Sequence, residues 1–259
     1  FTDDGFVLTS RLDLDELVTF LVEEYQPAPI VSPWNGGSGF YAGDATARAL
    51  HDLVLEHDDA RFDTLKTTIR IGRVVAPENK PDGAKDEHRK RELIQTCRNR
   101  FPDEAVRWID ALGVVDTDRA RFAPLLGTGG NDGRFELSKN FAENIVDVLM
   151  TTDAPGSGQR LRALLTRSGG VRLQKRSPGQ FDPGTAPNVG DDALIEPWAF
   201  VLAVEGLLLF ASTATRRAAG AGASGAGAAF PFLVQASAGG YGTSSASELN
   251  HSSSREELW

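Results

Sequence analysis

The spacing of apolar residues along the chain predicts helices, beginning close to the N-terminus. Apolar positions three or four residues apart run from Leu14 to Tyr25, and Pro27 ends this pattern. Asp13 and Glu16 have the spacing of a capping box just before it. The sequence therefore predicts an amphipathic helix with a defined start and a defined end.

The same period recurs along the chain, interrupted by proline and glycine. Further helices are expected over residues 45–54, 62–75, 87–99, 102–112, 141–149, 158–167 and 198–210. Asp44 is expected to cap the second helix, and Phe101-Pro102 to separate two others. Short apolar runs at 114–115, 119–122 and 231–235 predict short strands, and residues 77–86 a loop. The expected fold class is α+β, mainly helical with a few short strands and long Gly-rich loops.

Composition predicts three regions. Residues 152–196 are rich in Gly, Pro, Ser and Arg, which predicts a basic, mobile linker or loop. It would separate an N-terminal part (1–151) with two Gly-rich loops from a C-terminal part (197–259). The latter combines a buried helix with an Ala/Gly/Ser-rich segment. The longest apolar run, Ala199–Ala211, is too short for a bilayer, which needs about 20 residues, so no membrane contact is expected.

Charge first argues against a nucleic-acid binder, and its distribution then weakens that argument. The 259 residues hold 27 Lys and Arg against 36 Asp and Glu, a net charge of −9. Residues 1–30, however, hold seven acidic residues and one arginine, whereas residues 155–190 hold six basic residues and one acidic residue. Because phosphates sense charge within a Debye length of about 8–10 Å, a local basic stretch is sufficient to attract them.

Candidate metal and disulfide chemistry is sparse. A single cysteine excludes a disulfide framework and a cysteine-based zinc cluster, and the four histidines lack HExxH spacing. We therefore expect no metal and no cofactor. With no secretory leader recognised, a cytoplasmic location is expected.

The first candidate binding motif is Pro33–Phe40, PWNGGSGF. Its glycines permit positive φ and close backbone approach, and successive amides can form an anion-binding nest. Trp34, Phe40 and Tyr41 offer rings for base stacking. The alternative is a tight turn with aromatic anchors in the core. The candidate nucleic-acid-binding residues here are Asn35, Gly36, Gly37, Ser38 and Gly39.

The second motif is Pro124–Arg134, PLLGTGGNDGR, which is neither a P-loop nor a good Rossmann fingerprint. It offers amides, short polar side chains and a permanent charge, a set that suits a phosphate; an Asx-type turn is the alternative. Its candidate residues are Thr128, Gly129, Gly130, Asn131 and Arg134. Further phosphate-contacting candidates are Arg172, Lys175, Arg176, Arg216 and Arg217.

Searches for catalytic residues find no assembled apparatus. There is no GxSxG elbow, and Cys97 has no nearby histidine in the sequence, so it is interpreted as a packing residue. Glu205, in an apolar helix, is expected to be a buried carboxylate bonded to an arginine or to backbone amides. The expectation is a non-catalytic protein. Two alternatives stay open: an enzyme that holds a nucleotide or phosphorylated small molecule at 126–134, with Asp132 or Glu205 as acid or base, and an interaction scaffold.

Three long motifs in this order, PIVSPWNGGSGF, PLLGTGGNDGR and PWAFVLAVEGLLLFA, resemble the large-subunit family of type I-G (formerly type I-U) CRISPR effector complexes. The resemblance extends from about Phe6 to Trp259, through TCRNRFPDEAVRWIDALGV and GYGTSSA. The family tends to have Asp where this chain has Ala199. Family members are longer, so the chain is expected to be part of a longer subunit.

The resemblance implies a non-catalytic subunit of a Cascade-like antiviral surveillance complex. The expected partners are guide RNA, target DNA, backbone subunits and a helicase-nuclease. In such complexes base pairing reads the target, while protein reads shape and a short flanking motif. The large subunit is expected to recognise that flanking motif, stabilise the R-loop and help recruit the helicase-nuclease.

Overall fold

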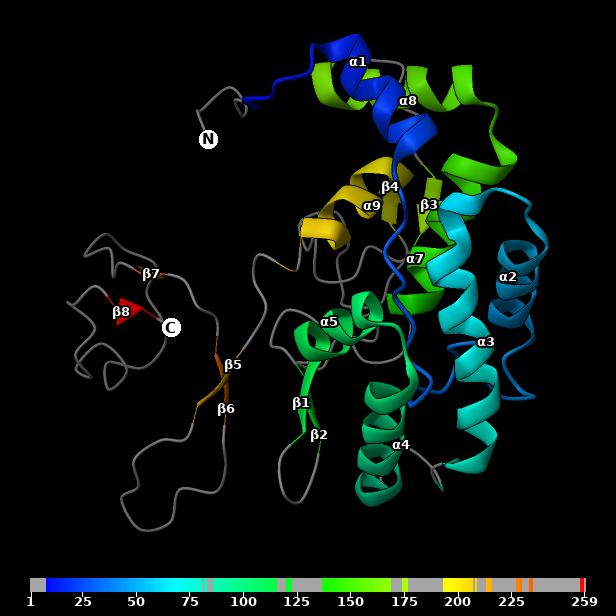
Figure 1. The fold of residues 1–259 in the computed structure, drawn as a ribbon. Helices are drawn as coiled ribbons and strands as arrows, with labels where there is room; N and C mark the ends of the chain where they lie inside the picture. Colours follow the sequence, from blue (N-terminus) through cyan, green and yellow to red (C-terminus); the bar gives the residue numbers. More distant parts are fainter. Residues whose placement is uncertain are drawn as a thin grey trace.

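A computed structural model of the protein describes residues 8–80, 82, 86–115, 120–122, 137–168, 174–176, 193–206, 208, 213–215, 227–229, 233–234 and 257–258. Its α-helices are α1 (Leu14–Thr19), α2 (Ala45–Glu56), α3 (Asp63–Glu78), α4 (Glu87–Arg100), α5 (Asp103–Leu112), α7 (Leu137–Val146), α8 (Ala154–Thr166) and α9 (Pro197–Glu205). Two π-helical turns, η1 (Phe20–Glu24) and η4 (Asp147–Thr151), continue α1 and α7, and a 3-10 turn, η2 (Ala60–Phe62), precedes α3. Figure 1 shows this arrangement.

The strands form two-stranded antiparallel pairs. The pairs are β1 (Gly113–Val115) with β2 (Ala120–Phe122), β3 (Gln174–Arg176) with β4 (Ala193–Ile195), β5 (Thr213–Thr215) with β6 (Gly227–Ala229), and β7 (Leu233–Val234) with β8 (Glu257–Leu258). The fold is thus α+β and mainly helical, which confirms the predicted class.

The helix starts follow the local signals in the sequence. At α1 the Glu16 amide donates to Asp13 Oδ1 at 2.8 Å, and the Asp13 amide donates to Glu16 Oε2 at 2.9 Å, so the predicted capping box is confirmed. Asp153 caps α8 by accepting from the Gly156 amide at 2.9 Å. Pro197 occupies the first turn of α9, where its missing N–H costs no hydrogen bond.

Several helix bounds differ from the prediction; α7 begins at Leu137 and α8 at Ala154, each four residues earlier than expected. α3 continues through Pro77 to Glu78, although Pro77 has no N–H to donate to the fourth preceding carbonyl. The predicted loop therefore begins two residues later than expected, at Asn79. The α-helix α9 is described as far as Glu205, and Gly206 and Leu208 are in 3-10 conformation; residues 207 and 209–210, the rest of the predicted helix, lie outside the described residues.

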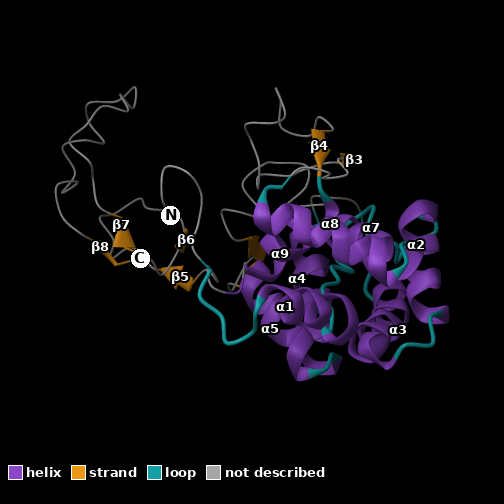
Figure 2. Cartoon of the chain, turned by 90° about the horizontal axis from the view of Figure 1, so that it is seen from above, coloured by secondary structure: helices purple, strands orange, loops and turns teal. Residues whose placement is uncertain are grey.

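One buried cluster joins the described helices, with members from α1 through α9. Within it α2 and α9 pack against α7, while α3 packs against α4 and α5. Figure 2 shows the helices gathered into one body. The region 152–196, predicted as a linker, contributes α8 and β4 to this core through the buried Leu161 and Ile195. These parts of the region therefore pack with the helices on both sides of it in the sequence; residues 169–173 and 177–192 lie outside the described residues.

Candidate nucleic-acid interface

The first Gly-rich motif is fastened by a carboxylate from the start of α2. Asp44 stands at the N-cap position but makes no side-chain bond to its own helix. Its Oδ1 accepts from the Gly37 amide at 3.0 Å, and its Oδ2 accepts from the Gly39 amide at 3.2 Å. Gly37 and Gly39 have φ of 81° and 93°, the left-handed region that favours glycine. The amides predicted to form a nest for an external anion are thus taken up by the protein's own carboxylate.

The rings of this motif anchor it in the core. Trp34 and Phe40 are buried, and only the half-buried Tyr41 keeps part of its ring accessible. The Tyr41 hydroxyl donates to the Pro33 carbonyl at 2.7 Å. Phe40 fits against α3, where a Cβ at Gly72 would lie 2.5 Å from its ring. Base stacking on Trp34 and Phe40 is therefore excluded, and the aromatic-anchor alternative describes these two rings.

The polar candidates of the motif are also largely inside. Asn35 and Ser38 are buried, and the Ser38 hydroxyl donates to the Asn35 carbonyl. Gly36 is exposed, and a Cβ built on it would meet no atom within 4 Å. Of the five predicted contact residues here, Gly36 and the half-exposed Gly37 are the ones that the surface presents.

His51 lies beneath the motif. Its ring centroid is 4.8 Å from that of Phe40, and a Cβ on Gly39 would come within 2.7 Å of its Cε1 atom. Burial, followed by the charge of Arg73, lowers the pKa of His51 to about 4, so the imidazole is neutral at pH 7. Its Nδ1 atom is buried, with no hydrogen-bond partner among the residues that the structure describes.

Other buried polar atoms, in the motif and on α7, also lack a hydrogen-bond partner within the described part of the chain. They are Trp34 Nε1, Asn35 Oδ1 and, on α7, Asn144 Oδ1. Leaving such an atom unpaired costs about 1–3 kcal/mol, so native structures rarely keep several. The hydroxyls of Ser32 and Ser138 lie 2.8 Å apart and join the residue before the motif to the first turn of α7.

The remaining sequence candidates fall mostly beyond what the structure describes. Thr128, Gly129, Gly130, Asn131 and Arg134 of the second motif, together with Arg172, Arg216 and Arg217, lie outside the described residues. Lys175 and Arg176 lie on β3, where they pair with Leu194 and Ala193 of β4. Their nucleic-acid contacts stay predictions.

A buried charge network is the main feature that the sequence analysis missed. Arg160 on α8 is buried; its Nε donates to Glu196 Oε1 at 3.0 Å, and its Nη1 donates to Asp147 Oδ1 at 3.3 Å. Gln174 on β3 donates to Asp147 at 2.6 Å. Glu196 also accepts from the Trp198 amide at the start of α9. Burial raises the pKa of Glu196, and the Arg160 charge opposes that rise.

This network ties α8, η4, β3 and α9 together. The available sequence signal was Glu196 directly before Pro197, an acidic side chain at a helix start. Its pairing with Arg160, 36 residues away, has no counterpart in local spacing.

Glu205 is half-buried rather than buried, and its carboxylate is hydrogen-bonded as expected. The Tyr25 hydroxyl and the Ala28 amide, the latter at 2.9 Å, both donate to its Oε1 atom. Burial raises the pKa of Glu205, and burial together with the Glu205 charge raises the pKa of Tyr25. The contact fastens the end of α9 to the segment after η1, with a tyrosine in place of the expected arginine.

Cys97 is fully buried in α4, and burial raises its thiol pKa to about 12. The expectation of a packing residue is therefore confirmed. Within the described parts of the chain, no cluster of His, Cys, Asp and Glu has the arrangement to hold a metal ion. Over the same residues, every helix is too short or too polar to cross a bilayer.

A scan against protein-family models finds no family that matches the chain, and a search of curated proteins finds no match either.

Proposed function

We propose that this chain is a non-catalytic large subunit of an RNA-guided CRISPR surveillance complex of type I-G, in which the Gly-rich motifs contact target DNA. The observation that carries the proposal is the 2.8 Å contact between Ser32 and Ser138. Ser32 directly precedes the first motif, and Ser138 follows Arg134 of the second motif by four residues. The flanks of two motifs about 90 residues apart are thereby joined.

The surface at the first motif suits a phosphate backbone. Gly36 presents an exposed peptide without a side chain, so a backbone can approach closely. Two cations lie beside the motif. Arg48 is exposed and follows Ala47, whose backbone carbon would lie 3.0 Å from a Cβ on Gly39. The Lys80 ammonium lies 5.7 Å from the centre of the Tyr41 ring. Contacts of this kind position DNA and carry no base sequence.

The hydrogen bonds from the Gly37 and Gly39 amides to Asp44 fix the conformation in which the first motif meets DNA. Because these two amides already donate to Asp44, they do not bind a DNA phosphate; the motif contacts DNA through the exposed backbone at Gly36. Base recognition in the flanking duplex is assigned to the second motif, through Asn131 and Arg134. The full complex supplies the positive field that a chain of net charge −9 lacks.

The test places a negative charge at Gly36 without disturbing the fold. Gly36→Glu has open space around it; Gly43→Glu, also exposed and open, is the matched control. The repulsion between a carboxylate and a phosphate about 8 Å apart is roughly 2 kcal/mol at an effective dielectric constant of about 20. Screening by salt over one Debye length reduces this repulsion to about 0.8 kcal/mol. Gly36→Glu should therefore weaken target-DNA binding by the assembled complex about fourfold, and more at low salt.

Arg134→Ala and Asn131→Ala extend the test to the second motif. They should weaken binding, and Arg134→Ala should also reduce its salt dependence. Unchanged affinity, salt dependence and flanking-motif preference in all three variants would contradict the proposal. If the chain alone bound or turned over nucleotides with a divalent metal, and Asp132→Ala abolished this, the enzyme alternative would replace it.

A further inference from the structure

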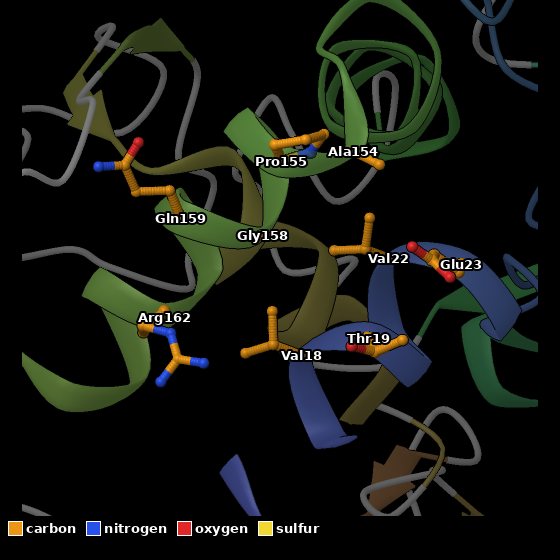
Figure 3. Close-up of a pocket in the computed structure, with 9 residues that line it drawn as sticks. All are labelled: Val18, Thr19, Val22, Glu23, Ala154, Pro155, Gly158, Gln159 and Arg162. Atoms are coloured by element: carbon orange, nitrogen blue, oxygen red, sulfur yellow. The ribbon is translucent and has the colours of Figure 1, made fainter. Parts of the chain in front are cut away.

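The N-terminal helix crosses α8 and leaves a groove on each of its sides. The groove between the two helices has a volume of about 410 Å³ and an apolar floor formed by Val18, Val22 and Pro155. Figure 3 shows both valines reaching toward α8. Gly158 lets the helices approach, because a Cβ there would lie 3.2 Å from Val18 Cγ1. The contact between α1 and α8 is therefore close but incompletely filled.

A second groove of about 420 Å³ is lined by residues of α1, of η1 and of the segment just before them. Leu12 and Phe20 line it and are 40% and 41% exposed, while Thr19 lines both grooves. Leu12 lies just before the N-cap residue Asp13 and Phe20 is the first residue of η1, so the two apolar side chains flank α1 in sequence. The two grooves and these two side chains are called the α1 face.

Acidic side chains surround these apolar positions. Asp15, Glu16, Glu23 and Glu24 line the two grooves, against one lining cation, Arg162 of α8. Arg162 pairs with Asp15, and Glu16 accepts from the Asp13 amide. Glu23 and Glu24 are exposed, with no ion-pair partner among the described residues. The α1 face is thus both apolar and negatively charged, and it repels a phosphate backbone.

We propose that the α1 face binds a basic amphipathic helix of another polypeptide. Such a helix would place apolar side chains over Leu12 and Phe20, with lysines or arginines beside Glu23 and Glu24. The charge complementarity selects this occupant over nucleic acid and over a second copy of the same acidic face. The inference does not depend on the proposed DNA contact, which lies at Gly36.

The test uses a fluorescein-labelled 18-residue amphipathic helix of leucine and lysine, titrated with the full-length chain and followed by fluorescence anisotropy. Phe20→Ser should weaken binding at least tenfold. Leu53→Ser, which replaces a 48% exposed apolar residue on α2, is the matched control and should change affinity less than twofold. The double variant Glu23→Lys/Glu24→Lys tests the charges without touching an apolar contact, and should also weaken binding at least tenfold.

Several outcomes would overturn the proposal. One is equal loss in Phe20→Ser and Leu53→Ser, and another is equally tight binding of a leucine–glutamate helix of the same length. Sedimentation showing a dimer that Phe20→Ser abolishes would assign the face to a second copy of the chain. A 20-nucleotide single strand whose binding is lost in Phe20→Ser would assign it to nucleic acid. The DNA-binding variant Gly36→Glu should bind the peptide like wild type, so the two proposals fail separately.

Discussion

Replacing Gly39 with alanine should destabilise the protein strongly, although it adds one methyl group. Gly39 has φ of 93°, and such left-handed backbone costs a residue with a Cβ about 1–2 kcal/mol. The added Cβ would lie 2.7 Å from His51 Cε1 and 3.0 Å from the Ala47 carbonyl carbon. Overpacking of this kind costs about 1–3 kcal/mol. The expected loss of unfolding free energy is therefore about 2–5 kcal/mol.

Urea unfolding followed by tryptophan fluorescence measures this loss, since a lower midpoint at constant slope reports stability alone. Gly36→Ala is the matched control within the same motif, because its Cβ would meet no atom within 4 Å. Its unfolding free energy should change by less than about 0.5 kcal/mol. The comparison separates the demands of position 39 from a general effect of adding a methyl group to the loop.

A double-mutant cycle with His51→Ala separates the two causes. In that background the imidazole contact is gone, while the backbone strain and the Ala47 contact persist. Gly39→Ala should therefore cost less there than in the wild type. The reasoning is refuted if Gly39→Ala costs less than about 0.5 kcal/mol, or if it costs the same in both backgrounds.

Two further predictions concern buried charge and pH. Arg160→Met leaves Glu196 and Asp147 without their buried cation and should lower the free energy of unfolding, measured in urea, by about 3–5 kcal/mol. In the control Arg162→Met, the partner Asp15 is 79% exposed, so the loss should be less than about 1 kcal/mol. Equal losses in the two variants would contradict the buried network. The pKa of His51 is about 4 in the folded protein and near 6.5 in the unfolded chain. Because the folded protein favours the neutral imidazole, this group contributes on the order of 3 kcal/mol of stability above pH ~6.5, and that contribution is lost as the pH falls through 4. Urea midpoints between pH 7 and pH 4 should fall less steeply in His51→Asn, and parallel curves would contradict this assignment.

Local patterns in the sequence were sufficient to predict most of the helices and several of their ends. The capping box of Asp13 and Glu16 and the break at Phe101-Pro102 both appear in the structure as predicted. Both signals act over three or four residues, so they need no tertiary contact. The bonded state of Glu205 was also predictable, because a carboxylate in an apolar helix is too costly to leave unpaired. Its tyrosine partner, 180 residues away, was not.

Tertiary packing alone decided which partners the polar groups of the candidate site bind. Asp44 was predicted to cap α2, yet its carboxylate accepts no hydrogen bond from the amides of that helix and instead accepts from two glycine amides of the preceding loop. Packing also placed His51 under Gly39 and Arg160 against Glu196. Periodicity and capping depend on neighbours within one or two turns, so the sequence by itself determined the helices. Which buried polar groups meet depends on how those helices pack, and only the folded chain brings such distant residues within hydrogen-bond distance.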